Sequence, residues 1–416
     1  MTAAVEPEVA GVDFARIGAC PSCRSDLEAE RSGFACRGCG RVWPVIDGVP
    51  RFVESEHYVE NFGYEWRRHR KTQFDTARCK ISEREFREKT GLTPDDVRGK
   101  LVLDVGVGTG RYADVVARWG GRVVGIDLSL AVLTARENLA RQGERAFVAQ
   151  ADLFKLPFKE QTFDIVYSIG VLHHTPSTRA AFRTIARCLK PGGVAAIAVY
   201  RWTDFTAYAS RYRRYTAAMS HGCLHFLSHG AIPKYHFLRA SRNFLSSQTQ
   251  SQLEKACFIA MHEDPAWRVL NTFDWYSPRY QWLHTEPEVM HWFEELGFEH
   301  VRAMPEPSMH SVRGVLPAGS ELRTPPETAE ERRNELTPPP AWVPAQPVWA
   351  RDAVLTVLVL GAVLRALCDV RWWSLSMTLP REVITSVVLA AKRLLGIEGD
   401  ILGRRSGGAG PGGRVA

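Results

Sequence analysis

The stretch LVLDVGVGTG, residues 101–110, decides the fold of the central part of this chain. It begins as a short apolar run of the kind that forms a buried strand, and it passes directly into a turn containing Gly106, Gly108 and Gly110. Turns of this kind bind nucleotide-type cofactors, because a backbone without a Cβ can approach the ligand closely. The stretch therefore predicts a cofactor site at the end of a strand.

The spacing of these glycines separates the cofactor classes. A dinucleotide-binding turn reads G-x-G-x-x-G, whereas the third glycine here comes one residue early. Asp104 stands two positions before the first glycine, where a carboxylate would repel a pyrophosphate and attract a cation. The turn thus disfavours a dehydrogenase. It favours S-adenosylmethionine (SAM), which carries an ammonium and a sulfonium and has no phosphate.

Residues 99–200 alternate predicted strands with predicted helices. The helices, over 111–119, 130–139 and 178–189, place apolar residues on one face. This alternation indicates an α/β fold with a parallel sheet covered on both faces, and ligands should lie outside the carboxyl ends of its strands. The strands are KLVLDV, RVVGID, AFVAQAD, FDIVYSIG and VAAIAVY, and EHVRAM and MHSVRGVL later predict a terminal hairpin.

Three further motifs follow the glycine turn in order. Asp127 ends the second strand, where a carboxylate can accept from both ribose hydroxyls. Asp152 follows the third, where it can accept from an adenine amine while Leu153 packs on the ring, and CLKPGG (188–193) turns into the fifth. Together these motifs resemble the class I SAM-dependent methyltransferases of the methyltransferase type 11 kind, related to ubiquinone/menaquinone-biosynthesis enzymes. The resemblance is strong over about residues 99–200 and looser over PEVMHWFEELGFEHV.

This resemblance implies a Rossmann-like seven-stranded methyltransferase sheet with helices on both faces, a helical cap insertion and C-terminal helices. It implies that Asp104 orients the methionine ammonium through the loop or a water, and that Arg111 reaches the methionine carboxylate. Ser168 and Ile169 would line the methyl face through backbone carbonyls. The implied cofactor-binding set is Asp104, Gly106, Gly108, Gly110, Arg111, Asp127, Leu128, Asp152, Leu153 and Ser168.

Two histidines are the predicted catalytic residues. Methyl transfer requires positioning and exclusion of water, and a hydroxyl or amine acceptor must also lose a proton. His173 and His174, in GVLHHT, follow the fourth strand, and a neutral imidazole there could take that proton. The alternative is that both histidines hydrogen-bond the cap or a neighbouring loop and transfer no proton.

Four of the nine cysteines form two C-x-x-C pairs. Cys20 and Cys23 are followed after twelve residues by Cys36 and Cys39, a spacing that predicts a tetrahedral zinc site. With four sulfur ligands no position remains for water, so the zinc would be structural and would supply much of the folding free energy of this small unit. Two unrelated redox or buried pairs are the alternative. The stretch from Cys20 through VWPVIDGVPRFV resembles the zinc ribbons found alongside nucleic-acid and small-molecule methyltransferases.

Composition shifts divide the chain into units with distinct character. Charged and aromatic residues alternate before the core, aromatic residues dominate after it, and a Pro-rich stretch precedes two apolar segments. The predicted units are a zinc ribbon (1–53), a helical N-terminal flap (54–98), the SAM-binding core (99–200), a helical cap (201–285), the last helix and terminal strands of the core (286–320), a Pro-rich linker (321–349), apolar C-terminal helices (350–402) and a disordered tail (403–416).

Charge and hydropathy constrain partners and location. The formal charge of +7 is spread along the 416 residues, so it gives nucleic acid only weak support. The first fifteen residues carry acids and no apolar core, which predicts a cytoplasmic protein and not a secreted one. The uncharged run 353–364 is shorter than the roughly twenty residues of a membrane span. Peripheral contact with the inner membrane face, anchored by Trp372 and Trp373, is an alternative to docking on a partner or on the protein's own sheet.

Three functions remain open at this point. The favoured one is methyl transfer from SAM to a hydroxyl or other nucleophile of a small-molecule, sugar or lipid-linked biosynthetic intermediate, with the cap closing over the acceptor. The second is methylation of rRNA or tRNA, with the ribbon binding RNA. The third is a non-catalytic SAM-binding adaptor. A further site is conceivable because His221, His225 and His229 recur at every fourth residue, but no carboxylate is nearby to complete a metal site.

Overall fold

The computed structural model describes residues 14–30, 32–54, 62–64, 74–76, 80–203, 206, 212–306, 308–324, 326, 352, 355–357 and 359–360. Most of the predicted linker and of the apolar C-terminal helices, including the tryptophan pair, lies outside these residues, as does the whole predicted tail. No helix among the described residues has both the length and the apolar character that crossing a membrane requires.

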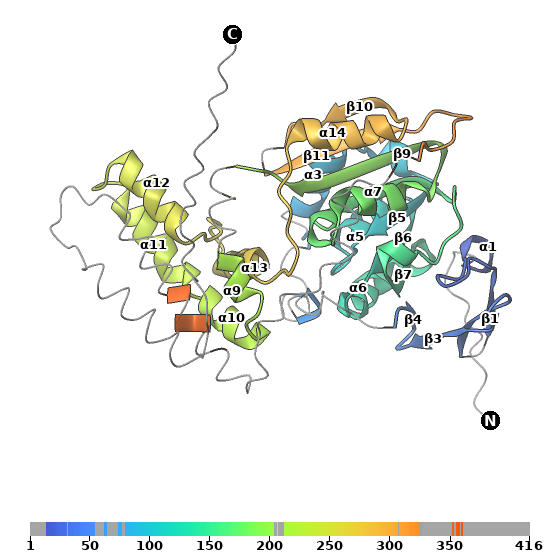
Figure 1. Cartoon of the computed structure of the whole chain (residues 1–416), viewed down its shortest axis with the longest axis horizontal. Helices are drawn as coiled ribbons and strands as arrows, with labels where there is room; N and C mark the ends of the chain where they lie inside the picture. Colours follow the sequence, from blue (N-terminus) through green and yellow to red (C-terminus); the bar gives the residue numbers. More distant parts are fainter. Residues whose placement is uncertain are drawn as a thin grey trace, which may run out of the picture.

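The predicted seven-stranded sheet is present as part of a larger one (Figure 1). Its order is β7-β6-β5-β8-β9-β11-β10, with the first five strands parallel and β11 antiparallel to both neighbours. The ribbon adds β1-β2-β3-β4 because β4 pairs in parallel with β7, so the sheet has eleven strands and the expected count was too small. The strands are β1 (Leu27–Glu30), β2 (Gly33–Cys36), β3 (Val42–Ile46), β4 (Val49–Phe52), β5 (Leu101–Val105), β6 (Arg122–Asp127), β7 (Ala146–Ala151), β8 (Phe163–Ile169), β9 (Leu189–Tyr200), β10 (Glu299–Ala303) and β11 (Met309–Val315).

Helices cover both faces of the sheet, as predicted. On one face α3, α4, α5 and α6 share a core with the strands, and on the other face α7 and α14 do so together with the ribbon. Local signals set their ends: Ser177 caps α7 and Thr285 forms a capping box with Glu288 in α14. The helical segments of this part are α1 (Phe14–Ile17), α3 (Ile81–Thr90), α4 (Pro94–Val97), α5 (Arg111–Arg118), α6 (Ala131–Leu139), η1 (Ala140–Arg145), η2 (Leu153–Lys155), η3 (Leu172–His174), α7 (Thr178–Ala186) and α14 (Glu286–Glu295).

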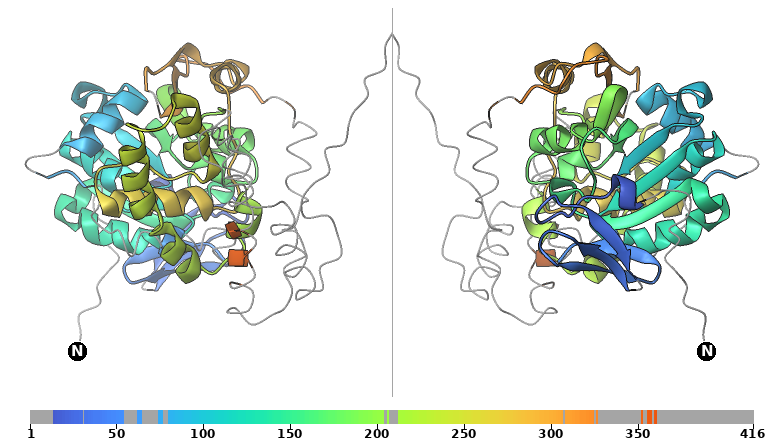
Figure 2. Two further views of the ribbon diagram at one scale, coloured as in Figure 1. Left: turned by 90° about the vertical axis from the view of Figure 1, so that its left-hand side faces the viewer. Right: turned by 90° about the vertical axis from the view of Figure 1, so that its right-hand side faces the viewer.

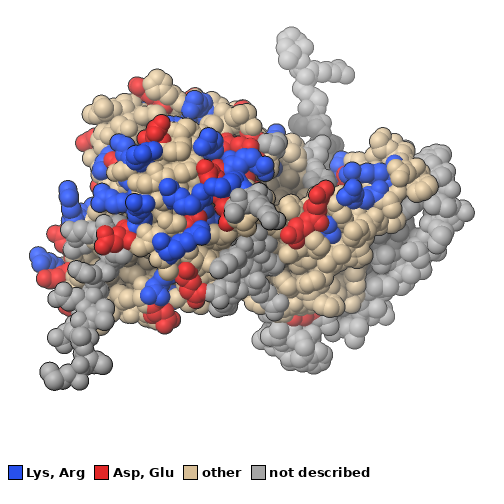
Figure 3. Space-filling view, turned by 180° about the vertical axis from the view of Figure 1, so that it is seen from behind, with Lys and Arg blue, Asp and Glu red and all other residues tan. Residues whose placement is uncertain are grey.

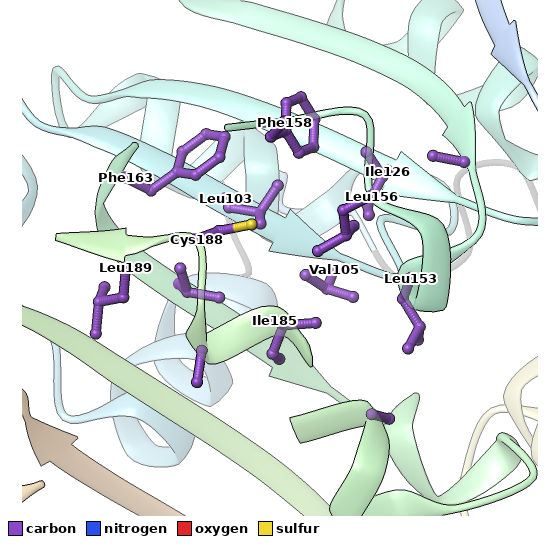
Figure 4. Close-up of a cluster of buried hydrophobic side chains, with 14 of the residues drawn as sticks. Leu103, Val105, Ile126, Leu153, Leu156, Phe158, Phe163, Ile185, Cys188 and Leu189 are labelled. Atoms are coloured by element: carbon purple, nitrogen blue, oxygen red, sulfur yellow. The ribbon is translucent and has the colours of Figure 1, made fainter. Parts of the chain in front are cut away.

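Side chains of the central strands alternate between the two cores. Val102 packs on one side of the sheet, and Leu103 and Val105 pack on the other. Figure 4 shows the second side, where the segment after β7 turns inward: Leu156 and Phe158 lie among the side chains of β5 and β6. The loop that follows Asp152 is therefore part of the core and not a loose surface segment.

The insertion after β9 is helical, as predicted, and has cores of its own. Ribbon and insertion lie towards opposite ends of the molecule, and Figure 2 views it from each end in turn. The insertion, here called the cap, consists of α9 (Arg213–Thr216), α10 (His221–Ser228), α11 (Ala231–Ser241), α12 (Ser247–Ala256) and α13 (Pro265–Tyr276).

The few described residues of the apolar C-terminal segment pack on the cap. Leu355 is buried in the core formed by α9, α10 and α13, and the backbone N–H of Ser220 donates to Oδ1 of Asp352 at 2.8 Å. These described residues contact the cap and not the sheet, whereas most of the segment lies outside the described residues.

Candidate functional site

A cavity of about 550 Å³ lies between the carboxyl ends of the parallel strands and the cap. Its size falls within the roughly 300–1,000 Å³ that is typical of pockets for small ligands. One wall consists of the glycine turn and the residues that follow β6, β7 and β8, and the other comes from residues 258–275. This is the position predicted for a ligand in an open α/β sheet.

The glycine turn exposes backbone to this cavity. Gly106 has a φ of 83°, and a Cβ there would lie 2.2 Å from the side chain of Val171. The turn is tied to β6, because the N–H groups of Gly106 and Val107 both donate to the carbonyl of Ile126 at 2.8 Å. Gly108, with a φ of 52°, also lines the cavity. Both glycines thus lie where the sequence predicted.

Asp127 lines the cavity at the end of β6 and also organises the loops around it. Its Oδ2 accepts from the backbone N–H of Gly108 at 3.0 Å, and its Oδ1 accepts from the N–H and hydroxyl of Ser129 at 2.9 and 2.8 Å. Burial raises the pKa of this carboxyl. Oδ1 therefore already accepts two hydrogen bonds, whereas Oδ2 accepts one and retains lone-pair capacity for a hydroxyl donor from the cavity.

The end of β7 supplies the neighbouring wall. Asp152 and Leu153 both line the cavity, as does Leu128 after β6. Oδ1 of Asp152 accepts from the N–H of Phe154 at 2.9 Å and thereby caps η2. This bond directs the carboxylate, and Oδ2 is the atom that could accept from an amine.

Arg111 lines the cavity at the start of α5, but it is already paired. Its Nη1 lies 3.0 Å from Oε2 of Glu85, and its guanidinium stacks on the ring of Tyr112 at 4.1 Å. Burial raises the pKa of the Glu85 carboxyl, but the nearby charges of Arg111 and Lys89 outweigh burial and lower this pKa to about 2. The cavity is therefore lined by the Glu85 carboxylate as well as by Arg111, the predicted cation. Glu85 was not predicted, because no motif in the charged segment before the core distinguishes it from the other acidic residues there.

Three predicted cofactor residues lie behind the cavity wall. Asp104 is buried and accepts from the hydroxyl of Tyr167 at 2.7 Å, and burial raises its pKa to about 7. Ser168 is fully buried, and its hydroxyl donates to the carbonyl of Val105 at 2.9 Å. A Cβ at Gly110 would meet Leu139 of α6 at 3.0 Å, so this glycine serves helix packing. None of these three residues is among those that line the cavity.

The two histidines differ in position. His173 is fully buried, neither ring nitrogen has a hydrogen-bond partner among the described residues, and burial lowers its pKa well below the usual range. Its ring stacks on Tyr200 with centroids 4.0 Å apart, and it is not among the residues that line the cavity. The His173 imidazole thus faces the core between η3 and β9, and this position does not support the expectation that it takes the acceptor's proton.

His174 does line the cavity. Its Nδ1 lies 2.9 Å from the carbonyl oxygen of Tyr280, and because a carbonyl only accepts, the proton of the neutral ring sits on Nδ1. Nε2 then carries no proton; it is buried, and no described residue bonds to it. Burial lowers the pKa of His174 to about 3, so this imidazole can accept a hydrogen bond but holds a proton poorly.

The cap contributes a carboxylate that the sequence did not single out, and the end of β9 contributes a hydroxyl. The hydroxyl of Tyr200 donates to Oδ2 of Asp274 on α13 at 2.8 Å, and both residues line the cavity. Burial raises the pKa of Asp274 to about 6. Trp275 stacks on Tyr200 at 5.4 Å and on Phe258 at 4.6 Å, which gives this end aromatic walls. In the sequence, Asp274 could have been recognised only as the single acidic residue within the aromatic run VLNTFDWYSPRY.

Comparison with known proteins agrees with this geometry. Residues 103–197 match the family described as "Methyltransferase domain". Over 167 residues the chain is 32% identical to a sterol 24-C-methyltransferase of Eremothecium gossypii, covering 38% of this chain and 41% of the relative. It is 33% identical over 98 residues to a ubiquinone biosynthesis O-methyltransferase of Coxiella burnetii, covering 23% of this chain and 42% of that one.

The chain contains a class I SAM-dependent methyltransferase domain. It spans about two fifths of the length of these curated relatives. A solved O-methyltransferase family protein from Burkholderia thailandensis has 16% identity and a TM-score of 0.36, covering 58% of this chain and 57% of that chain.

Beside the methyltransferase domain lies a cluster of four cysteine thiols. The Sγ atoms of Cys20 and Cys39 are 3.8 Å apart and those of Cys23 and Cys36 are 3.3 Å apart, with all four within 4.8 Å of one another. Four sulfurs about 2.3 Å from a zinc at tetrahedral angles would be about 3.8 Å apart. The backbone N–H groups of Gly38 and Cys39 also point at Cys36 Sγ, at 3.3 and 3.4 Å, as donors to a thiolate. The donor set fits zinc.

No second cluster accompanies it in the described ranges. Of the three histidines spaced along α10 and its end, His225 and His229 contact each other with ring centroids 5.0 Å apart, and His221 lies 5.6 Å from the ring of Tyr64. Nδ1 of His229 bonds the carbonyl of His225. These residues pack the cap and do not converge on a metal position.

Proposed function

We propose that this protein transfers a methyl group from SAM to a hydroxyl or other nucleophile of a small acceptor enclosed between the sheet and the cap. One observation carries the proposal. A single cavity has the residues suited to a nucleoside at one end and, at the other, aromatic side chains of the cap around one carboxylate. The acceptor would be a compact molecule, with an apolar body and at least one polar group, such as a biosynthetic intermediate.

SAM suits the chemistry of the first end. Asp127 would accept from the ribose hydroxyls and Asp152 from the adenine amine, while Leu128 and Leu153 offer apolar contacts to the nucleoside. The Cβ-free turn at Gly106 and Gly108 supports close approach of a ligand without phosphate. When bound, SAM supplies a methyl group made electrophilic by its sulfonium.

The ion pair of Glu85 and Arg111 suits the amino-acid end of SAM. A zwitterion presents an ammonium and a carboxylate, and this pair offers one partner for each. Arg111 would bind the methionine carboxylate, as predicted, and Glu85 would add the ammonium contact for which the sequence suggested Asp104. Both side chains are partly buried, so such contacts would be stronger than at the surface.

Asp274 is the better candidate for the group that receives a proton from the acceptor. Its pKa of about 6 leaves it ionised near neutral pH yet able to hold a proton, whereas the pKa of His174 is about 3. The hydroxyl of Tyr200 holds the carboxylate in place. The ring of His174, which lines the cavity, would contact the same acceptor. The roles predicted for the histidine pair thus divide between His174 and Asp274.

We further propose that the four-cysteine cluster binds one structural zinc. Its sulfur spacing and the N–H donors around it support this. With four sulfurs around the metal, no coordination position would remain for a substrate or water. The zinc would therefore have no part in the methyl transfer.

RNA methylation is less well supported. Figure 3 shows lysine and arginine side chains interleaved with acidic ones on the face it displays. Around Asp114, for example, Arg118 and Arg141 lie 3.1 and 2.8 Å from the carboxylate, so these cations are already paired. A nucleic-acid groove would instead gather unpaired cations in one stripe. A non-catalytic adaptor would have no need of a polar acceptor end in the cavity.

The test is to incubate radiolabelled SAM with the full-length protein and cell extract, and to separate RNA, protein, lipid and small-molecule fractions. We expect label in the small-molecule or lipid fraction. Asp274→Asn should lower incorporation by about 10²–10⁴-fold. Asp264→Asn, at the exposed start of the same helix, is the matched control and should leave it unchanged. Label in the RNA fraction alone, or SAM binding without incorporation anywhere, would reject the proposal.

A further inference from the structure

The ribbon and the cofactor site are connected by more than sequence proximity. Strand β4 pairs with β7 so that Arg51 lies opposite Gln150 and Phe52 opposite Ala151, the residue just before Asp152. Phenylalanine rings from both units also form one cluster, in which centroids lie 4.8 to 5.9 Å apart: Phe14, Phe34, Phe52, Phe147 and Phe158. The ribbon therefore shares its core with the strand that carries the adenine side of the site.

A buried chain of hydrogen bonds runs from β4 to the cavity. Nη1 of Arg51 donates to Oε1 of Gln150 at 2.6 Å, and Nε2 of Gln150 donates to the carbonyl of Leu128 at 2.7 Å. Because the Leu128 carbonyl can only accept a hydrogen bond, the NH₂ group of the Gln150 amide must face it. Oε1 of Gln150 then faces Arg51. Arg51 and Gln150 are 8% and 3% exposed, so loss of either would leave a buried polar group without its partner. Leu128 lines the cavity beside Asp127.

A second connection starts inside the cysteine cluster. Arg24, immediately after Cys23, has a φ of 68°, a left-handed conformation imposed by the first cysteine turn. Its guanidinium donates to the carbonyls of Leu156 and Phe158, at 2.6 and 2.5 Å. The backbone N–H of Ala19 also donates to Pro157. The segment held in this way directly follows η2, the turn that begins at Leu153 in the cavity wall.

We propose that the ribbon is a positioning element of the cofactor site, so that folding of the four-cysteine cluster and affinity for SAM are coupled. The inference rests on the proposed function in that SAM is taken as the ligand. The cysteine turns orient Arg24 and β4, and these hold the two segments that would contact the nucleoside, one beginning at Leu128 and one at Asp152. When the cluster loses its metal, the turns are no longer held, and the adenine side of the cavity loses two of its supports.

The first test measures SAM affinity by calorimetry on the full chain. Arg24→Met removes both carbonyl contacts and should weaken SAM binding by about fivefold or more, without loss of the native circular dichroism spectrum. Arg37→Met is the matched control, because Arg37 is an exposed arginine of the same ribbon and pairs with Glu28, another exposed ribbon residue, at 3.2 Å. Its affinity should equal that of the parent. Equal affinities for the parent, Arg24→Met and Arg37→Met would overturn the proposal.

The second test needs no cofactor. Removing the metal with a chelator should raise amide hydrogen exchange at residues 128–131 and 152–159, while strands β5 and β8 stay protected. Exchange in those two segments that does not change on metal removal would also overturn the proposal. If the parent protein fails to bind SAM, the proposed function fails, but this exchange experiment still decides whether ribbon and site are coupled.

Discussion

Substitution of Asp127 tests the placement of the cofactor most directly. In Asp127→Ala, charge-assisted hydrogen bonds to the ribose are lost, at a cost of about 2–4 kcal/mol. At 1.4 kcal/mol for each factor of ten, SAM affinity should fall by about 30- to several-hundred-fold. Three protein donors, the N–H groups of Gly108 and Ser129 and the Ser129 hydroxyl, also lose their acceptor, so the alanine variant should unfold at a lower temperature.

Asp127→Asn separates these two effects. The amide oxygen can still accept on one side, but its NH₂ group must face either Gly108 N–H or Ser129 N–H, which are donors as well. We therefore expect SAM affinity to fall by about tenfold, with less loss of thermal stability than in the alanine variant. Calorimetry gives the affinity, and thermal unfolding followed by circular dichroism gives the stability.

Asp164→Asn is the matched control. Asp164 also accepts from a backbone N–H, that of Leu101 at 2.8 Å, but it lies at the amino end of β8, away from the cavity. This variant should lose stability and keep its SAM affinity within about twofold of the parent. If Asp127→Asn and Asp127→Ala bind SAM as tightly as Asp164→Asn does, the nucleoside is not anchored at the end of β6 and our placement is wrong.

Further predictions concern metal, core and pH. Protein purified without added metal should contain one zinc per chain by mass spectrometry, and Cys20→Ser should lose it; a folded ribbon without metal would contradict this. His173→Ala should lower the free energy of unfolding in urea by about 2–4 kcal/mol and leave SAM affinity unchanged. A variant with parental stability and weaker SAM binding would instead show that His173 belongs to the binding site. Burial raises the pKa of Asp104 in the folded protein to about 7, above the roughly 3.9 of an unfolded chain. The contribution of the protonated Asp104 carboxyl to stability is therefore fully present below about pH 3.9 and is lost as the pH rises through about 7. Asp104→Asn keeps an acceptor for Tyr167, and its melting temperature relative to the parent should therefore rise between about pH 5 and about pH 8; a constant difference would contradict the assignment.

The features that could be predicted from the sequence are those that local spacing determines. The glycine turn, the carboxylates at the ends of β6 and β7 and the two cysteine pairs each follow from residues close together in the chain. Strand alternation then brings the strand ends together, because parallel strands present their carboxyl ends at one edge.

The remaining features depend on contacts between distant segments. The position of His173 in the sequence does not determine whether its ring turns toward β9 or toward the cavity. Packing of the ring against Tyr200 determines this orientation. Asp274 reaches the site only because α13 folds back over the strand ends, and no short motif marks that helix. The docking of the ribbon on β7 depends on Arg24 and Arg51 meeting partners more than ninety residues away.

The continuous sheet also determines which strand edges face solvent. Strand β4 pairs with β7 at Gln150 and Ala151, so without the ribbon the carboxyl end of this apolar strand would present unpaired backbone donors and acceptors. With the ribbon in place, the terminal strands are β1, with the sequence LEAE, and β10, with the sequence EHVRA; both are short and charged, as is usual for strands that resist pairing with other molecules. If the proposed metal holds the ribbon in place, its removal should expose the end of β7, and self-association measured by light scattering should increase.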